Sequence, residues 1–267
     1  MENVEAASPS KKQRMEHEAP VSPSKSQKTE HKATADESQK THPKLKLYYF
    51  NIPGKGEPIR LACAYGGVEL DDFRMHANEF HDLKVSGKLA FGQVPALSVN
   101  DDQMIFQSAA IMRYVGKLTG LYPTNDDLLA AKIDMIVDSE NDMFTGLAVS
   151  RYRGRFGFGF LTEDHVATVR KSLNDEILPE HLRNVEKLLE ESTSGWVAGT
   201  ANPSIADFIL VPRLLWLVEA DTNHGISDSL LEGYPRICAL IKQLLALPAV
   251  VAFYEKHAKL HLPAHLK

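Results

Sequence analysis

Residues 44–67 have the sequence KLKLYYFNIPGKGEPIRLACAYGG, which predicts a strand, a turn and a helix in direct succession. The first seven residues alternate polar and apolar side chains and then become aromatic, as a half-buried strand does. Residues 51–56 hold one proline and two glycines, which is typical of a turn. The helix that follows has Pro58 in its first turn, and a pair of glycines is expected to end it.

The residues that follow complete a small α/β unit. We expect a second strand over 68–75, then a loop, then a hairpin formed by 95–99 and 104–106. Ser108 is expected to cap a further helix that closes at Gly120.

After Pro123 the pattern changes to apolar residues at helical spacing, with no convincing strand. Helical patterns cover 128–149, 162–190, 204–219 and 234–257. The predicted fold is therefore an α/β domain over 44–123 followed by an all-helical domain over 124–267.

The composition excludes two classes of protein. The 267 residues carry 30 basic and 35 acidic side chains, and the formal charge of -5 argues against a general polyanion binder such as a nucleic-acid protein. No apolar run approaches the ~18 residues that a membrane span needs. The two cysteines, Cys63 and Cys238, form no CxxC pair, and the chain starts with no apolar signal stretch. We therefore expect a cytoplasmic protein that does not bind membranes.

Residues 1–43 contain no Leu, Ile, Phe, Tyr or Trp. Such a segment buries too little apolar surface to offset the entropy lost on ordering, so a disordered tail is expected. Its basic and acidic side chains are equal in number, which disfavours a nucleic-acid arm or a transit peptide. The sequence SPSK occurs at 8–11 and again at 22–25, either as a modification or partner-binding repeat or as part of a neutral spacer.

Three features of the α/β domain point to a small anionic ligand. Gln107-Ser108 lies at a strand-to-helix junction, where free amides and the helix dipole attract a carboxylate. A cis Val94–Pro95 bond would leave backbone groups free to pair with an extended peptide, whereas an ordinary edge-strand proline is the alternative. Tyr49 could donate a hydrogen bond to a ligand thiolate and lower its pKa below the ~8.5 of a free thiol, or it could be a core residue.

Three motifs of this domain closely resemble the glutathione-binding half of cytosolic glutathione transferases, in particular the sigma-like, tyrosine-type class. They are LYYFNIPGKGEPIR at 47–60, FGQVP at 91–95 and QSAAIMRY at 107–114. IDMIVDSEND at 133–142 and SIADF at 204–208 resemble the helical domain of the same family. The resemblance extends over about residues 45–262, with the motifs in the expected order and at the expected spacing.

The resemblance implies a thioredoxin-like first domain, an all-α second domain, a homodimer and an enzyme that conjugates glutathione to small hydrophobic electrophiles in detoxification. It implies that Tyr49 is the catalytic phenol and that Lys55 replaces an arginine supporting the tyrosine or the thiolate. Glutathione would be a co-substrate, and no cofactor or metal is expected. The implied glutathione-binding residues are Tyr49, Phe80, Lys84, Gln93, Val94, Pro95, Gln107, Ser108 and Asp142.

The resemblance gives five of these residues an expected place along the tripeptide. Phe80 and Lys84 would border the glycine end, although Phe80 stands where the family has a tryptophan and the loop after Lys84 is two residues longer. Val94 would pair through its backbone with the cysteinyl part. Gln107 and Ser108 would hold the γ-glutamyl carboxylate.

Three alternative functions remain open from the sequence. One is a glutathione-dependent isomerase or peroxidase on the same thiolate, and another is a non-enzymatic relative with a structural or ligand-carrying role. The third is an interaction module in which the tail recruits partners to a dimeric globule. In either enzymatic case the second substrate is expected near Ile52, Pro53, Phe144, Arg151 and Tyr152.

Asp134, Asp138 and Asp142 follow one another at i, i+4 and i+8, so they share one face of a helix. The alternatives are a solvated face and, for Asp142, a contact across the dimer with the γ-glutamyl ammonium. Ser204 and Asp207 have the spacing of a capping box. The histidines show no metal-ligand spacing and are interpreted as surface or packing residues.

Overall fold

The computed structural model describes residues 42–219, 222–257 and 262–266, so the predicted tail falls outside it apart from His42 and Pro43. The first domain is a four-stranded mixed sheet with the order β2-β1-β3-β4. Its strands are β1 (Leu45–Phe50), β2 (Asp71–Met75), β3 (Ala96–Val99) and β4 (Gln103–Phe106), and its helices are α1 (Glu57–Gly66), α2 (Ala77–Val85) and α3 (Ser108–Thr119). This is the predicted thioredoxin-like α/β domain.

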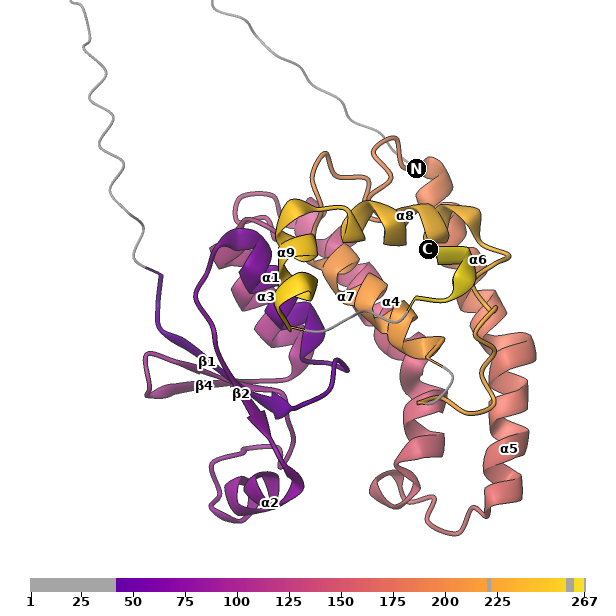
Figure 1. Cartoon of the computed structure of the whole chain (residues 1–267), viewed down its shortest axis with the longest axis horizontal. Helices are drawn as coiled ribbons and strands as arrows, with labels where there is room; N and C mark the ends of the chain where they lie inside the picture. The colour runs from indigo at the N-terminus through magenta and orange to yellow at the C-terminus, as the bar shows by residue number, and fades with distance from the viewer. Residues whose placement is uncertain (1–41, 220–221, 258–261, 267) are drawn as a thin grey trace, which may run out of the picture. The chain divides into compact units, whose positions relative to one another are not determined.

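The central strand is β1, which pairs parallel with β2 and antiparallel with β3. Leu45, Leu47 and Tyr49 alternate with half-buried residues, as the period of a strand requires, and point into the core. α1 and α3 pack on one another, and Figure 1 shows both above the sheet as drawn, with α2 below it.

Three local predictions about this domain are wrong. The expected loop after β2 contains α2, which starts with a capping box in which Glu79 accepts the His76 N–H at 2.7 Å. Its apolar pattern is weak because none of its residues is buried. The second strand starts at Asp71 rather than at residue 68, since the Val68 N–H is used to cap α1. Gln107, not Ser108, is the N-cap residue of α3, and its carbonyl accepts the Ile111 N–H.

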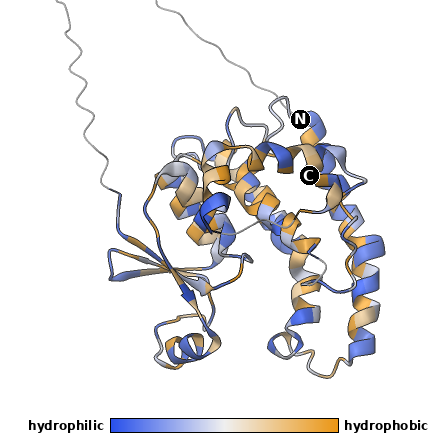
Figure 2. Ribbon diagram, viewed as in Figure 1, coloured by the Kyte–Doolittle hydropathy of each residue, from blue (hydrophilic) through white to orange (hydrophobic). Residues whose placement is uncertain are grey.

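The second domain consists of helices, as predicted from the apolar spacing. They are α4 (Asp127–Arg151), α5 (Glu163–Ser172), α6 (Leu178–Glu191), α7 (Ile205–Leu217), α8 (Pro235–Leu245) and α9 (Pro248–His257), with short turns η1 (Arg153–Phe156), η2 (Leu173–Ile177) and η3 (Ala264–Leu266). α7 is buried along almost its whole length and contacts α1, α4 and α8. Figure 2 shows it mostly orange, while the outer helices carry blue faces. No single described helix is long and apolar enough to cross a membrane, although the bent pair α8 and α9 together passes that test.

The two domains meet where α3 approaches the start of α7. A Cβ atom on Gly116 would lie 2.5 Å from Cγ2 of Ile205, so only glycine permits this approach. The Ile205 N–H also donates to the carbonyl of Leu121 at 2.9 Å. These contacts fix α3 against the helical domain.

The capping box of α7 is present and buried. Asp207 accepts hydrogen bonds from the Val197 N–H at 2.8 Å, the Ser204 N–H at 2.8 Å and the Ser204 hydroxyl at 3.0 Å. One carboxylate thereby orders the start of α7 and the loop that precedes it.

Asp207→Ala is expected to lower the free energy of unfolding by about 3 kcal/mol, because three buried donors lose their acceptor. Urea denaturation measures the change. Asp228→Ala, which removes an exposed carboxylate, is the control and should change stability by less than ~0.5 kcal/mol. A loss below ~1 kcal/mol in Asp207→Ala would contradict this role.

Candidate functional site

A cavity of about 700 Å³ lies between the α/β domain and helices α4 and α7. Most of the predicted glutathione site lines it, namely Tyr49, Lys55, Phe80, Lys84, Gln93, Val94, Pro95, Gln107 and Ser108. Asp142 does not line it, since its side chain is exposed on α4 beside Asn141, which does. The structure therefore brings together residues spread over sixty positions of one domain and leaves one predicted residue outside.

Tyr49 lies near the end of β1, is buried, and lines the cavity. The hydroxyl oxygen accepts the backbone N–H of Lys55 at 3.0 Å, and within the described residues no acceptor takes the phenolic proton. Burial raises the pKa of Tyr49, against the lowering effect of the Lys55 N–H. The phenol is therefore protonated at neutral pH, and its proton is free for a ligand.

The turn around Tyr49 is closed tightly by its glycines. A Cβ on Gly54 would lie 2.6 Å from the Tyr49 hydroxyl, and one on Gly56 would lie 2.5 Å from the ring. Gly54 also adopts a φ of +41°, a region that other residues rarely occupy. The glycines of this turn are thus needed for the Lys55 N–H to reach the phenol.

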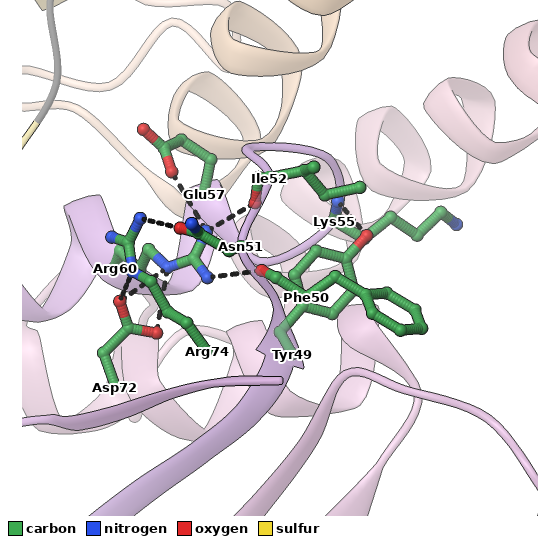
Figure 3. A network of polar contacts seen from close by, with 9 residues as sticks. All are labelled: Tyr49, Phe50, Asn51, Ile52, Lys55, Glu57, Arg60, Asp72 and Arg74. Carbon is green, nitrogen blue, oxygen red and sulfur yellow. Dashed lines mark hydrogen bonds and ion pairs between the residues drawn. The ribbon is translucent and has the colours of Figure 1, made fainter. Parts of the chain in front are cut away.

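Arg60, which is 2% exposed, holds the same turn from its other side (Figure 3). Its guanidinium donates to the carbonyls of Phe50 at 3.2 Å and Ile52 at 2.8 Å, and to both oxygens of Asp72 at 3.0 Å. It also forms an ion pair with Glu57 at 3.3 Å. This buried network joins β1, α1 and β2, and it fixes the backbone that leads from Tyr49 to Lys55.

The Lys55 side chain points away from that network and donates from Nζ to Oδ1 of Asn141 on α4 at 3.1 Å. Burial lowers the pKa of Lys55, while the charge of Glu140 opposes that change. Lys55 therefore acts in two ways at this site, through its backbone on Tyr49 and through its side chain on α4.

The expected anion-binding edge of the cavity is also present. Gln107 has the unusual φ of 67° at the start of α3, and Ser108 follows as the first residue of the helix, where the amides are free. The Val94–Pro95 bond is cis, so the first of the two alternatives for this proline is confirmed. Among the described residues, no backbone group pairs with Val94, which leaves it available to a peptide-like ligand.

The aspartate stripe on α4 is partly neutralised. Arg113 of α3 forms ion pairs with Asp134 at 2.7 Å and with Asp138 at 3.4 Å. No ion pair is made by Asp142 within the part of the chain that the structure describes. The first two aspartates therefore join the domains, and the third takes no part in this contact.

The other half of the cavity contains four of the five residues predicted for the second substrate, Ile52, Phe144, Arg151 and Tyr152. Pro53 lies between the lining residues Ile52 and Gly54 but does not itself line the cavity, and its carbonyl accepts the N–H of Gly56 and Glu57.

Sequence analysis missed the buried ion pair between Arg213 of α7 and Glu140 of α4, which are 2.8 Å apart. Arg213 lines the cavity, as do Trp216 and Asn141. A signal was present, because Arg213 interrupts the apolar run of α7 and a buried arginine requires a partner.

Neither cysteine is placed for catalysis. Burial raises the pKa of Cys63 to about 12, and neither cysteine lines the cavity. Within the described residues, no group of His, Cys, Asp and Glu could hold a metal ion.

Comparison with known proteins gives a consistent result. A family model of the glutathione S-transferase N-terminal domain matches residues 45–117, and one of the C-terminal domain matches 156–257. The chain is 30% identical over 216 residues to a glutathione S-transferase of Anopheles gambiae, which covers 80% of this chain and 97% of that protein. It is 31% identical over 223 residues to glutathione S-transferase P of Caenorhabditis elegans, covering 83% of this chain and 97% of the other.

Relatives named for a different activity also match. The chain is 30% identical over 220 residues to hematopoietic prostaglandin D synthase of Gallus gallus, with 81% and 98% of the two chains covered. The solved structure of prostaglandin synthase D of Nilaparvata lugens matches with a TM-score of 0.69 and 27% identity, over 83% of this chain and all of that one. The predicted activity, conjugation of glutathione by an enzyme, is confirmed by these comparisons, and the chain belongs to the glutathione S-transferase family.

Proposed function

We propose that this enzyme is a sigma-like, tyrosine-type glutathione transferase in which the Tyr49 hydroxyl stabilises the glutathione thiolate. The observation that carries the proposal is the hydrogen bond from the Lys55 N–H to the Tyr49 oxygen. Since that oxygen already accepts a bond, its proton is directed toward the cavity. A thiolate that accepts this proton is stabilised, so its pKa falls and more nucleophile is present at neutral pH.

We assign each remaining site residue to the part of glutathione that it contacts. Lys84 and Phe80 border its glycine end, Gln93, Val94 and Pro95 face the cysteinyl part, and Gln107 and Ser108 bind the γ-glutamyl carboxylate. The support for this placement is that all of them line one cavity with Tyr49. The α3 N-terminus adds free amides and a favourable dipole for the carboxylate.

The same thiolate also serves the second candidate function, a glutathione-dependent isomerisation. The observation in its favour is the similarity to two proteins named prostaglandin D synthase. Glutathione is a co-substrate in conjugation and is regenerated in isomerisation, and neither reaction needs a further cofactor. We place the enzyme in the cytoplasm with a role in detoxification, in keeping with its two unpaired cysteines.

Tyr49→Phe tests the catalytic assignment. Loss of a hydrogen bond to an anion costs about 1.5–3 kcal/mol, so kcat/KM for conjugation of an aromatic halide should fall about 10- to 100-fold. The KM for glutathione should change little, because the rest of the site is intact. Since the pKa of Tyr49 is raised, the wild-type rate should not decline from phenol ionisation below about pH 10.

Stopped assays over pH 6–10 give both results. Full activity in Tyr49→Phe would contradict the assignment. If the loss in kcat/KM came from a much higher KM for glutathione, Tyr49 would be assigned to binding instead.

Arg60→Lys tests the positioning of the turn. Lysine keeps the charge but cannot reach the two carbonyls and Asp72 together, so kcat should fall about tenfold while the KM for glutathione stays within about twofold. Lys46→Gln, which breaks a surface ion pair with Asp71 on the same sheet, is the matched control and should leave kcat unchanged. An unchanged kcat in Arg60→Lys would show that the turn holds its shape without the guanidinium.

The expected homodimer gives Asp142 its proposed partner, the γ-glutamyl ammonium bound by the other subunit. Asp142→Ala should then raise the KM for glutathione about tenfold with little effect on kcat. Asp138→Ala, on the same helix face but paired with Arg113, is the control and should not. Sedimentation equilibrium at micromolar concentration should give a dimer; a monomer with normal affinity for glutathione would contradict the assignment.

A further inference from the structure

The cavity around Tyr49 is lined by basic side chains and, among the described residues, by no acidic one. The basic lining residues are Lys55, Lys84, Arg151, Arg155 and Arg213. Lys84 borders glutathione in the proposed binding mode, and Lys55 adds its charge to the same cavity although its side chain donates to Asn141. The two carboxylates, one ammonium and ionised thiol of glutathione leave two net negative charges, which the lysines offset. The three arginines therefore remain for the second substrate.

Arg213 is the most constrained of the three, being only 6% exposed. Its Nε donates to Glu140 at 2.8 Å, and its guanidinium carbon lies 4.0 Å from the ring centroid of Phe144 and 4.7 Å from that of Trp216. Within the described residues no acceptor pairs with Nη1 or Nη2. A planar guanidinium held on one edge and against two rings presents a preorganised fork, which fits a carboxylate.

Arg151 and Arg155 add positive charge on the side of the cavity formed by the end of α4 and by η1. Arg151 lies 5.1 Å from the Trp216 centroid and donates to the carbonyl of Thr222. Neither arginine forms an ion pair in the described part of the chain, whereas Arg153 between them pairs with Glu163 at 2.7 Å. Tyr152, half exposed, adds apolar surface at the same place.

We propose that the preferred second substrates of this enzyme are hydrophobic electrophiles that carry a carboxylate, which Arg213 binds through its two terminal nitrogens. Phe144 and Trp216 contact the apolar body, and Arg151 and Arg155 raise the positive potential at the entrance. The inference rests on the proposed function, because it requires the thiolate at Tyr49. A neutral electrophile of the same shape gains the apolar contacts alone.

The test compares 4-chloro-3,5-dinitrobenzoate with its methyl ester. In both, the glutathione sulfur forms a bond to the ring carbon, chloride leaves with the electron pair of the C–Cl bond, and the thiol proton passes to solvent. Each kcat/KM is divided by the rate constant of the uncatalysed reaction with glutathione, which removes the difference in intrinsic reactivity. We expect the corrected kcat/KM of the acid to be about ten times that of the ester, because one charge-assisted hydrogen-bonded pair stabilises a complex by about this factor.

Variants assign the preference to residues. Arg213→Gln should abolish it, and Arg151→Gln should reduce it about threefold. Glu140→Gln should increase it, because the negative charge that offsets Arg213 is removed, and it remains informative if Arg213→Gln fails to fold. Arg153→Gln, which breaks an ion pair outside the cavity lining, is the matched control and should keep the wild-type ratio.

Equal corrected rates for acid and ester in the wild type would overturn the proposal. An equal loss on both substrates in Arg213→Gln, with the ratio unchanged, would also overturn it and would assign Arg213 to the thiolate. Tyr49→Phe is measured on the methyl ester, so a failure of the tyrosine mechanism is detected separately from a failure of carboxylate recognition.

Discussion

The active site depends on one buried guanidinium. Arg60 binds the carbonyl of Phe50 at the end of β1, the carbonyl of Ile52 in the turn that follows, and the carboxylate of Asp72 on β2, so it fixes the backbone between Tyr49 and Lys55. The Lys55 N–H can then saturate the Tyr49 oxygen and leave the phenolic proton for a ligand. A charge buried in this way costs desolvation energy, and it is tolerated here because its partners are complete. The chemistry of the tyrosine thus rests on a structural contact that never touches the substrate.

Much of the fold could be predicted because its signals are local. The alternation of β1, the glycines after α1 and the capping box of α7 each follow from a few neighbouring residues. α2 was missed because it buries none of its residues and therefore has no apolar period. The N-cap of α3 was predicted one residue too late, at Ser108. The backbone angle φ of 67° at Gln107 shows that the loop ends there, and this angle is not visible in the sequence.

The glutathione half of the site was predictable through motif resemblance, and so were four lining residues of the other half, but the buried ion pairs that support both halves were not. Arg60 and Arg213 act through partners that lie at distant positions, Asp72 in one case and Glu140 in the other. Spacing along one chain does not show such pairs. They appear only when the strands and helices are packed, and this is why the positive charge beside Phe144 and Trp216 became visible in the structure alone.

The most direct test of this account is the pKa of the thiol in bound glutathione, measured by titrating the ultraviolet absorbance of the thiolate in the binary complex. If the phenolic proton of Tyr49 is directed at the sulfur, the apparent pKa of the bound thiol must lie at least about one unit below the ~8.5 of a free thiol. A bound thiol that titrates at the free value would contradict the account, because glutathione would then bind without being activated.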